Sequence, residues 1–147
     1  MIGCLSLGRE TFDVNFANKK IDLVEKRLNK LSNNIIFFEK LVTNDEISEE
    51  ALSFFKQKKC KKYLIIQSTF TDSKFIKKFT KVFKKPIFFI SFKEKRTGGR
   101  LRLNSLCGVN LGLHSLIKNK IYSDFVIFDK EVKYFNKKIV EFINNKD

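Results

Sequence analysis

The pattern that decides the fold lies in the first 31 residues, "IGCLSL" (2–7), "GRETFD" (8–13) and "VNFANKKIDLVEKRLNKL" (14–31). The first run is apolar without alternation, which is typical of a strand covered on both faces. In the last run, apolar residues recur at spacings of three and four from Val14 to Leu31, which places them in one stripe of a helix. The stretch therefore predicts a buried strand, a polar loop and a helix.

The same unit recurs along the chain. Further short apolar runs are "IIFF" (35–38), "YLII" (63–66), "PIFFI" (86–90) and "DFVIF" (124–128). Helical stripes lie between and after them, at Phe75, Phe79 and Phe83 and at Val132, Phe135, Ile139 and Phe142. Alternating strands and helices predict an α/β fold, a doubly wound, mostly parallel five-stranded sheet with helices on both faces. We expect a Rossmann-like architecture with the flavodoxin-like strand order.

Polar residues mark two expected helix starts. Thr43 with Glu46 fits a capping box, and Thr69 with Asp72 offers a similar arrangement. Pro86 opens the fourth expected strand, where a missing backbone donor costs least.

Length and composition indicate one globular domain over residues 1–147. A chain of 147 residues buries about 70% of its unfolded surface, and 43% of its residues are apolar. Every apolar run is shorter than the ~18 residues of a membrane span, and the first residues do not resemble a secretion signal. Three cysteines without framework spacing are expected as reduced thiols. We therefore expect a cytoplasmic protein without a membrane partner.

The formal net charge of +14 invites a nucleic-acid hypothesis. The lysines, however, are spread over almost every expected helix, which is typical of a solvated surface. Such a surface attracts polyanions weakly and with strong salt dependence. No zinc-finger, basic-zipper or ribonucleoprotein motif occurs, so no specific nucleic-acid partner is expected.

Three polar loops follow the carboxyl ends of expected strands, where open parallel sheets bind ligands. They are "GRETFD" (8–13), "QSTFTD" (67–72) and "SFKEKRTGGRLRLNS" (91–105), the last unusually long. Their polar side chains are ligand candidates. A surface ion pair is an equally open role for Arg9, and helix capping is one for Asp13 and Asp72.

Several enzyme classes are excluded. The chain has neither a dinucleotide glycine fingerprint nor a phosphate loop, and Arg9 stands where a receiver domain needs acidic residues. Cys107 and His114 are seven residues apart on one expected helix, so roughly 10 Å of rise separates them and they form no dyad. A lone histidine cannot build a metal site. We expect neither a complete catalytic set nor a metal site in this chain, with Cys107 a packed thiol and His114 a core or interface histidine.

Three segments, "LGRETFDVNFA" (7–17), "IIQSTFTD" (65–72) and "TGGRLRLNSLCGVNLGLHSL" (97–116), together resemble the amino-terminal domain of the L-fucose/L-arabinose isomerase-like family. The resemblance implies a ketol isomerase that interconverts aldoses and ketoses with a divalent metal, usually manganese. It also implies a multidomain, oligomeric enzyme whose amino-terminal domain lends polar residues to the sugar site, often that of a neighbouring subunit. The metal-ligating carboxylates and histidine belong to later domains.

The resemblance also implies roles for individual residues. The loop "GGRLRLNSLCG" (98–108) would close over a sugar or an adjoining subunit, although Gly98 and Gly99 also fit a simple turn and Asn104 and Ser105 a helix cap. The expected substrate-binding residues are Arg9, Thr11, Asp13, Gln67, Thr69, Asn104, Ser105 and Cys107.

The chain is much shorter than such isomerases, so it is expected to be inactive without the missing catalytic domains. The expected partners are those domains, further copies of the chain and a monosaccharide. Two alternatives stay open at this point, a stand-alone sugar- or anion-binding module and a weak nucleic-acid-binding protein.

Overall fold

The computed structural model describes residues 1–95 and 98–145, in which five strands and five helices alternate. The first half contains β1 (Ile2–Leu7), α1 (Val14–Leu31), β2 (Ile35–Val42), α2 (Asp45–Lys56) and β3 (Lys62–Gln67). The second half contains α3 (Lys74–Val82), β4 (Ile87–Phe92), α4 (Ser105–Lys118), β5 (Ser123–Phe128) and α5 (Val132–Asn144). No helix in these two ranges is long and apolar enough to cross a membrane.

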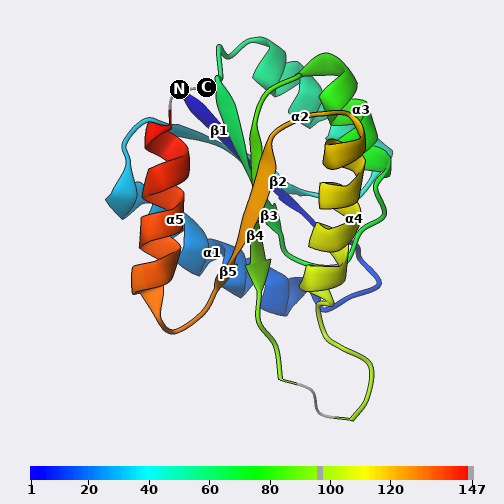
Figure 1. Cartoon of the computed structure of the whole chain (residues 1–147). Coiled ribbons are helices and arrows are strands. Elements are labelled where there is room, and N and C mark those ends of the chain that lie inside the picture. Colours follow the sequence, from blue (N-terminus) through cyan, green and yellow to red (C-terminus); the bar gives the residue numbers. More distant parts are fainter. Residues whose placement is uncertain (96–97, 146–147) are drawn as a thin grey trace.

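The five strands form one parallel sheet in the order β2-β1-β3-β4-β5, so the predicted doubly wound fold and its flavodoxin-like order are confirmed. Helices α1 and α5 cover one face, and α2, α3 and α4 cover the other (Figure 1). Strand order reverses at β1, whose neighbours β2 and β3 are reached over opposite faces of the sheet. A crevice at the carboxyl ends of β1 and β3 is the expected ligand position in such a sheet.

Successive strand residues supply the two cores alternately. In β3, Tyr63 and Ile65 pack toward α2 and α3, whereas Leu64 and Ile66 pack toward α1 and α5. Because both faces are covered, all residues of β1, β3 and β4 are buried. Double coverage explains why these strands appear in the sequence as continuous apolar runs.

Strand β2 extends four residues beyond the predicted run 35–38. It is an edge strand paired only with β1, and it carries the exposed charged residues Glu39 and Lys40. Charged residues are common on edge strands because they hinder pairing with other chains. The prediction from the apolar run alone was therefore too short for this strand.

Both predicted capping boxes are wrong. Asn44, not Thr43, caps α2, and its side chain accepts a hydrogen bond from the Ile47 N–H at 2.9 Å. Helix α3 begins at Lys74 after Ser73, so Thr69 lies outside it. Asn and Ser are as favourable at the N-cap position as Thr. Residue type alone therefore could not show which of several adjacent polar residues caps each helix.

Helix α4 lies unusually close to the sheet because two glycines face it. A Cβ atom at Gly108 would lie 2.8 Å from the Gln67 side chain, and one at Gly112 would lie 2.7 Å from the Phe89 ring. Phe89 is fully buried and cannot swing away. The two glycines therefore set the depth at which α4 packs above β3 and β4.

Replacing Gly112 with Ala should destabilise the fold by up to about 2 kcal/mol. The added methyl group meets the Phe89 ring, and overpacking costs about 1–3 kcal/mol against a gain of about 1 kcal/mol in helix propensity. Urea unfolding measures the change in the free energy of unfolding. In a matched Gly99→Ala control, nothing lies within 4 Å of the added atom, so stability should stay within about 0.5 kcal/mol. Equal effects of the two substitutions would contradict this packing.

Candidate functional site

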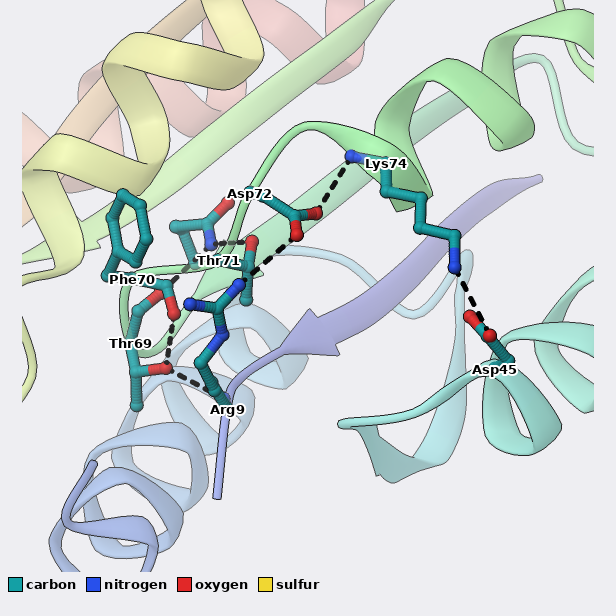
Figure 2. A network of polar contacts seen from close by, with 8 residues as sticks. Arg9, Asp45, Thr69, Phe70, Thr71, Asp72 and Lys74 are labelled. Carbon is teal, nitrogen blue, oxygen red and sulfur yellow. Dashed lines mark hydrogen bonds and ion pairs between the residues drawn. The ribbon is translucent and has the colours of Figure 1, made fainter. Parts of the chain in front are cut away.

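The candidate site lies at the carboxyl edge of the sheet, where the segments after β1, β3 and β4 meet. The described residues of these segments are 8–13, 68–73, 93–95 and 98–104. Figure 2 shows the first two side by side, with Arg9 facing Asp72 and with Lys74 next to Asp45. The predicted convergence of three polar loops on one edge is confirmed.

Arg9 is held at this edge through both its backbone and its side chain. Its N–H donates to Thr69 Oγ1 at 2.9 Å, and its Nη2 donates to Asp72 Oδ2 at 3.2 Å. The guanidinium also lies 5.3 Å from the centre of the Phe70 ring. With 39% of its side chain exposed, Arg9 keeps donors open to solvent while its position is set by three neighbouring residues.

Gln67, at the end of β3, is 1% exposed and bonds to its own loop. Its Nε2 donates to the Thr69 carbonyl at 2.9 Å and to Thr71 Oγ1 at 2.8 Å. Ser68, also buried, donates from Oγ to the Leu7 carbonyl at 2.7 Å. These bonds shape the loop after β3 and tie it to β1.

Ser105, the first residue of α4, joins three elements inside the protein. Its Oγ donates to the Gln67 carbonyl and accepts from the Phe92 N–H at 3.0 Å. It also lies 3.0 Å from Ser91 Oγ, which completes a buried polar cluster. The carboxyl ends of β3 and β4 are thereby tied to the start of α4.

The loop after β4 projects beyond the sheet before the chain enters α4 (Figure 1), and the last part of the loop contacts the start of α1. Arg102 bonds to Asp13 Oδ2 through Nε at 3.0 Å and Nη2 at 2.7 Å, and its guanidinium lies 3.8 Å from the centre of the Phe16 ring. The Glu94 carboxylate accepts from the N–H groups of Leu103 and Asn104 at 3.0 and 2.7 Å. The end of the loop is therefore fixed. Residues 96–97 of the predicted loop lie outside the described residues.

Asp13 serves as a helix cap, which the sequence analysis gave as the alternative to ligand binding. Its Oδ1 accepts from the Phe16 N–H at 3.0 Å at the start of α1. The hydrogen bond from Arg102 and that from Phe16 together lower the pKa of this carboxyl group below its ordinary value.

The predicted substrate-binding residues divide into two sets by burial. Arg9, Thr11, Asp13, Asn104 and Cys107 are at least partly exposed, whereas Gln67, Thr69 and Ser105 are buried. Asn104 has the left-handed φ of 53° directly before α4. Cys107 and His114 are exposed on α4 rather than packed in the core. A substrate contact remains a prediction for all eight residues. To contact a substrate, however, the three buried residues would first have to give up hydrogen bonds that they make within the protein.

A pocket of ≈ 210 Å³ opens at this edge between the end of β1 and the starts of α2 and α3. Its lining includes Gly8, Arg9, Asn44, Thr71, Asp72 and Lys74. The lining also includes the apolar side chains of Leu7, Val42 and Phe75, so hydrogen-bonding groups and apolar surface are combined, as in many small-molecule sites. Across residues 1–95 and 98–145, no group of three or more His, Cys, Asp or Glu residues could hold a metal ion.

Sequence reasoning missed three residues of the site. Arg102 and Asp13 are 89 positions apart, so no local pattern signals their pairing. Glu94 holds the backbone just before α4 from ten residues upstream, well beyond the reach of a capping-box motif. Thr71 lies within a quoted loop, but its contact with Gln67 depends on how that loop turns.

The fold and the site together define a doubly wound α/β domain with a polar site at the carboxyl edge of its sheet. Residues 3–145 match the family described as the fucose/sulfoquinovose isomerase N-terminal domain. The chain belongs to this family, which confirms the fucose isomerase resemblance.

Two curated relatives are similar to almost the whole chain. The sulfoquinovose isomerases of Priestia aryabhattai and of Priestia megaterium (strain ATCC 12872 / QMB1551) are each 31% identical to it over 138 residues. The match covers 94% of this chain and 31% of each relative. The chain thus spans about a third of the length of these relatives.

Replacing Ser105 with Ala should destabilise the protein by about 1–3 kcal/mol, because the buried Phe92 N–H and Gln67 carbonyl each lose a partner. Thermal or urea unfolding measures the loss. Ser53→Ala, at an exposed position of α2, is the matched control and should change stability by less than about 0.5 kcal/mol. An unfolding free energy unchanged by Ser105→Ala would contradict the structural role of this hydroxyl group.

Replacing Arg102 with Gln should raise the pKa of Asp13 toward its ordinary value, because the charged hydrogen-bond donor is lost. Since the folded-state pKa is lowered, the ionised Asp13 stabilises the fold above its unfolded pKa, and this stability is lost as pH falls through the folded pKa. NMR titration of the Asp13 carboxyl carbon measures the pKa, and urea unfolding at several pH values measures the change in stability. An Arg100→Gln control should leave the titration nearly unchanged, and identical curves for the wild type and Arg102→Gln would contradict the pairing.

Proposed function

We propose that this chain is the N-terminal, substrate-side domain of an aldose–ketose isomerase, whose metal-binding catalytic domain lies outside these 147 residues. The family match over residues 3–145 supports the isomerase lineage. One structural observation carries the substrate-side role. Arg9, fixed by Thr69 and Asp72 but still exposed, lines a pocket of mixed polar and apolar character at the edge of the sheet where ligands are expected.

Arg9 would bind and orient the sugar. A guanidinium group offers several N–H donors in a rigid plane, and hydrogen bonds from a charged donor are stronger than neutral ones. Asp72 and Phe70 restrict the motion of the Arg9 side chain, so less conformational entropy is lost on binding. This chain would therefore position the substrate, and the proton transfer between adjacent sugar carbons would take place on groups of the catalytic domain.

The metal of the complete enzyme, manganese or another divalent ion, would polarise sugar oxygens. The described residues of this chain do not fit such an ion, because no cluster of carboxylate, histidine or cysteine ligands occurs among them. No step of the reaction is therefore assigned to a metal on this domain.

The substrate class is a monosaccharide. The family description names fucose and sulfoquinovose, and both relatives are sulfoquinovose isomerases. Sulfoquinovose carries an anionic sulfonate group, which would be drawn to the cationic side chains Arg9, Lys74 and Lys78 around the pocket. Each of these already pairs with a carboxylate, so the sulfonate would have to compete with Asp72, Asp45 or Glu49. L-Fucose and sulfoquinovose are accordingly the first two sugars to compare.

We also propose a cellular compartment and partners for the enzyme. The three cysteines are free, which suits the reducing cytoplasm. We further propose that the chain works in a homo-oligomer, where its site would complete the sugar site of a neighbouring subunit, and that it has no specific nucleic-acid partner.

A chimeric enzyme tests this function. The chain would replace the corresponding N-terminal third of the Priestia megaterium relative, and the chimera should isomerise a sugar. Arg9→Ala should then lower kcat/KM at least about tenfold, because a charged hydrogen bond contributes about 1.5–3 kcal/mol. Lys26→Ala, at an exposed position of α1 away from the site, is the control and should leave the rate unchanged.

Two results would contradict the proposal. One is a folded, metal-loaded chimera that isomerises neither sugar, and the other is an Arg9→Ala chimera as active as its parent. Calorimetry on the isolated chain examines the alternative of a stand-alone binding module. Millimolar or tighter binding of a sugar by the chain alone, lost in Arg9→Ala, would favour that alternative if the chimera is inactive.

A further inference from the structure

A second pocket, of ≈ 530 Å³, lies between the ends of α3 and α4, which are neighbours on one face of the sheet (Figure 1). Because α3 and α4 run back to the starts of β4 and β5, this pocket lies at the opposite edge of the sheet from the candidate site. The two pockets share no lining residue. The second pocket is lined by Lys77, Thr80, Lys81, Lys84, Asn119 and Ile121.

The segments around the second pocket are rich in lysine and contain no acidic residue. Residues 74–85 contain six lysines and residues 105–122 contain two, and neither segment contains an Asp or a Glu. Acidic residues are not rare in this chain, because 16 occur among its 147 residues. The pocket therefore lies in a region of positive potential, which attracts anions.

Helix α3 carries lysines on two sides, and those that face α2 are neutralised within the protein. Lys74 Nζ lies 3.2 Å from Asp45 Oδ2. Lys78 forms an ion pair with Glu49. Both carboxylates belong to α2, so the charge of these two lysines is already paired.

The lysines at the second pocket lack such partners. Lys77 and Lys81 are about one turn apart on α3, and Lys84 follows shortly after the helix ends. Across residues 1–95 and 98–145, none of these three ammonium groups pairs with a carboxylate. Like charges one helical turn apart repel each other. A bound anion would offset this repulsion.

The other polar side chains of the pocket have already used their hydrogen-bond donors. Thr80 Oγ1 donates to the Ile76 carbonyl at 2.9 Å, and Asn119 Nδ2 donates to the Ser115 carbonyl at 2.8 Å. The side-chain donors left in this lining are the three ammonium groups, which cannot accept a hydrogen bond. A phosphate dianion, which only accepts, fits this set better than a neutral sugar, whose hydroxyl groups also donate.

The wall that α4 contributes is held in place by its backbone. Lys120 has the left-handed φ of 57°, and its N–H donates to the Ile117 carbonyl at 3.1 Å. The Ile121 N–H donates to the Leu116 carbonyl at 3.0 Å. A ligand would therefore meet a preformed wall, which lowers the entropy lost on binding.

We propose that the second pocket binds the phosphate ester of a small organic molecule. Lys77, Lys81 and Lys84 would donate charge-assisted hydrogen bonds to the phosphate oxygens. The volume lies within the range of about 300–1,000 Å³ that is typical of small-molecule sites. The side chain of Ile121 adds apolar surface for the organic part of the ligand. Inorganic phosphate would use the same charges but leave this part of the pocket empty.

NMR titration of the whole chain tests the proposal, with ribose 5-phosphate as the probe. At about pH 7.5 the phosphate group is a dianion, and about 0.15 M salt screens nonspecific attraction. Ribose 5-phosphate should bind with a Kd on the order of 1 mM or below and shift the amide signals of residues 77–84 and 119–121 most. Inorganic phosphate should bind several-fold more weakly, and ribose should shift none of these signals.

Paired substitutions locate the binding site. Lys77→Gln together with Lys81→Gln should raise the Kd at least about tenfold, because two charged donors are lost. Lys26→Gln together with Lys30→Gln is the matched control, since it removes the same charge at the same spacing from exposed positions of α1 on the other face of the sheet. The control should bind like the wild type. Circular dichroism checks the fold of each variant.

Four results would overturn the proposal. The first is a wild type that does not bind the ester at this salt concentration, and the second is equal weakening by the two double substitutions. The third is inorganic phosphate that binds as tightly as the ester, because charge alone would then be recognised. The fourth is a single-stranded oligonucleotide that binds the same residues more tightly than the ester, which would assign the surface to nucleic acid. The proposal is independent of the isomerase role, because binding is measured without substrate or catalytic domains.

Discussion

Buried hydrogen bonds at the carboxyl edge of the sheet position the whole candidate site. Gln67, Ser68 and Ser105 lie where strands end and the chain turns, and each has lost its contact with water. An unpaired buried polar group costs about 1–3 kcal/mol, so these side chains must find partners within the protein. Their bonds join β1, β3, β4 and α4, and the loop that Gln67 shapes carries the Thr69 and Asp72 side chains that hold Arg9.

This constraint separates two kinds of residue at the site. The buried residues form a framework, and Arg9 and Asp72 are the groups it presents to solvent. The close packing of α4 belongs to the same framework, because Gly108 leaves room for the Gln67 side chain. A ligand at this edge would meet side chains whose positions are set before it arrives, which favours selective binding.

The fold was predictable because its determinants are local in the sequence. Continuous apolar runs reflect double coverage of β1, β3 and β4, and stripes such as that of α1 reflect one buried helical side. The partners of the site residues were not predictable. The Arg102–Asp13 pair and the Ser105–Gln67 bond join positions far apart in the chain, so they depend on the tertiary structure. For the same reason, sequence could not show that Ser105 bonds inward while Arg9 stays exposed.

The central claim is that this framework presents Arg9 to a sugar whose chemistry is completed by other domains. A crystal structure of the chain joined to the catalytic domains of a relative, with a sugar bound, is the most direct measurement. The account predicts a sugar oxygen within about 3 Å of the Arg9 guanidinium. A sugar bound to the catalytic domains with the carboxyl edge of this sheet facing solvent would contradict it.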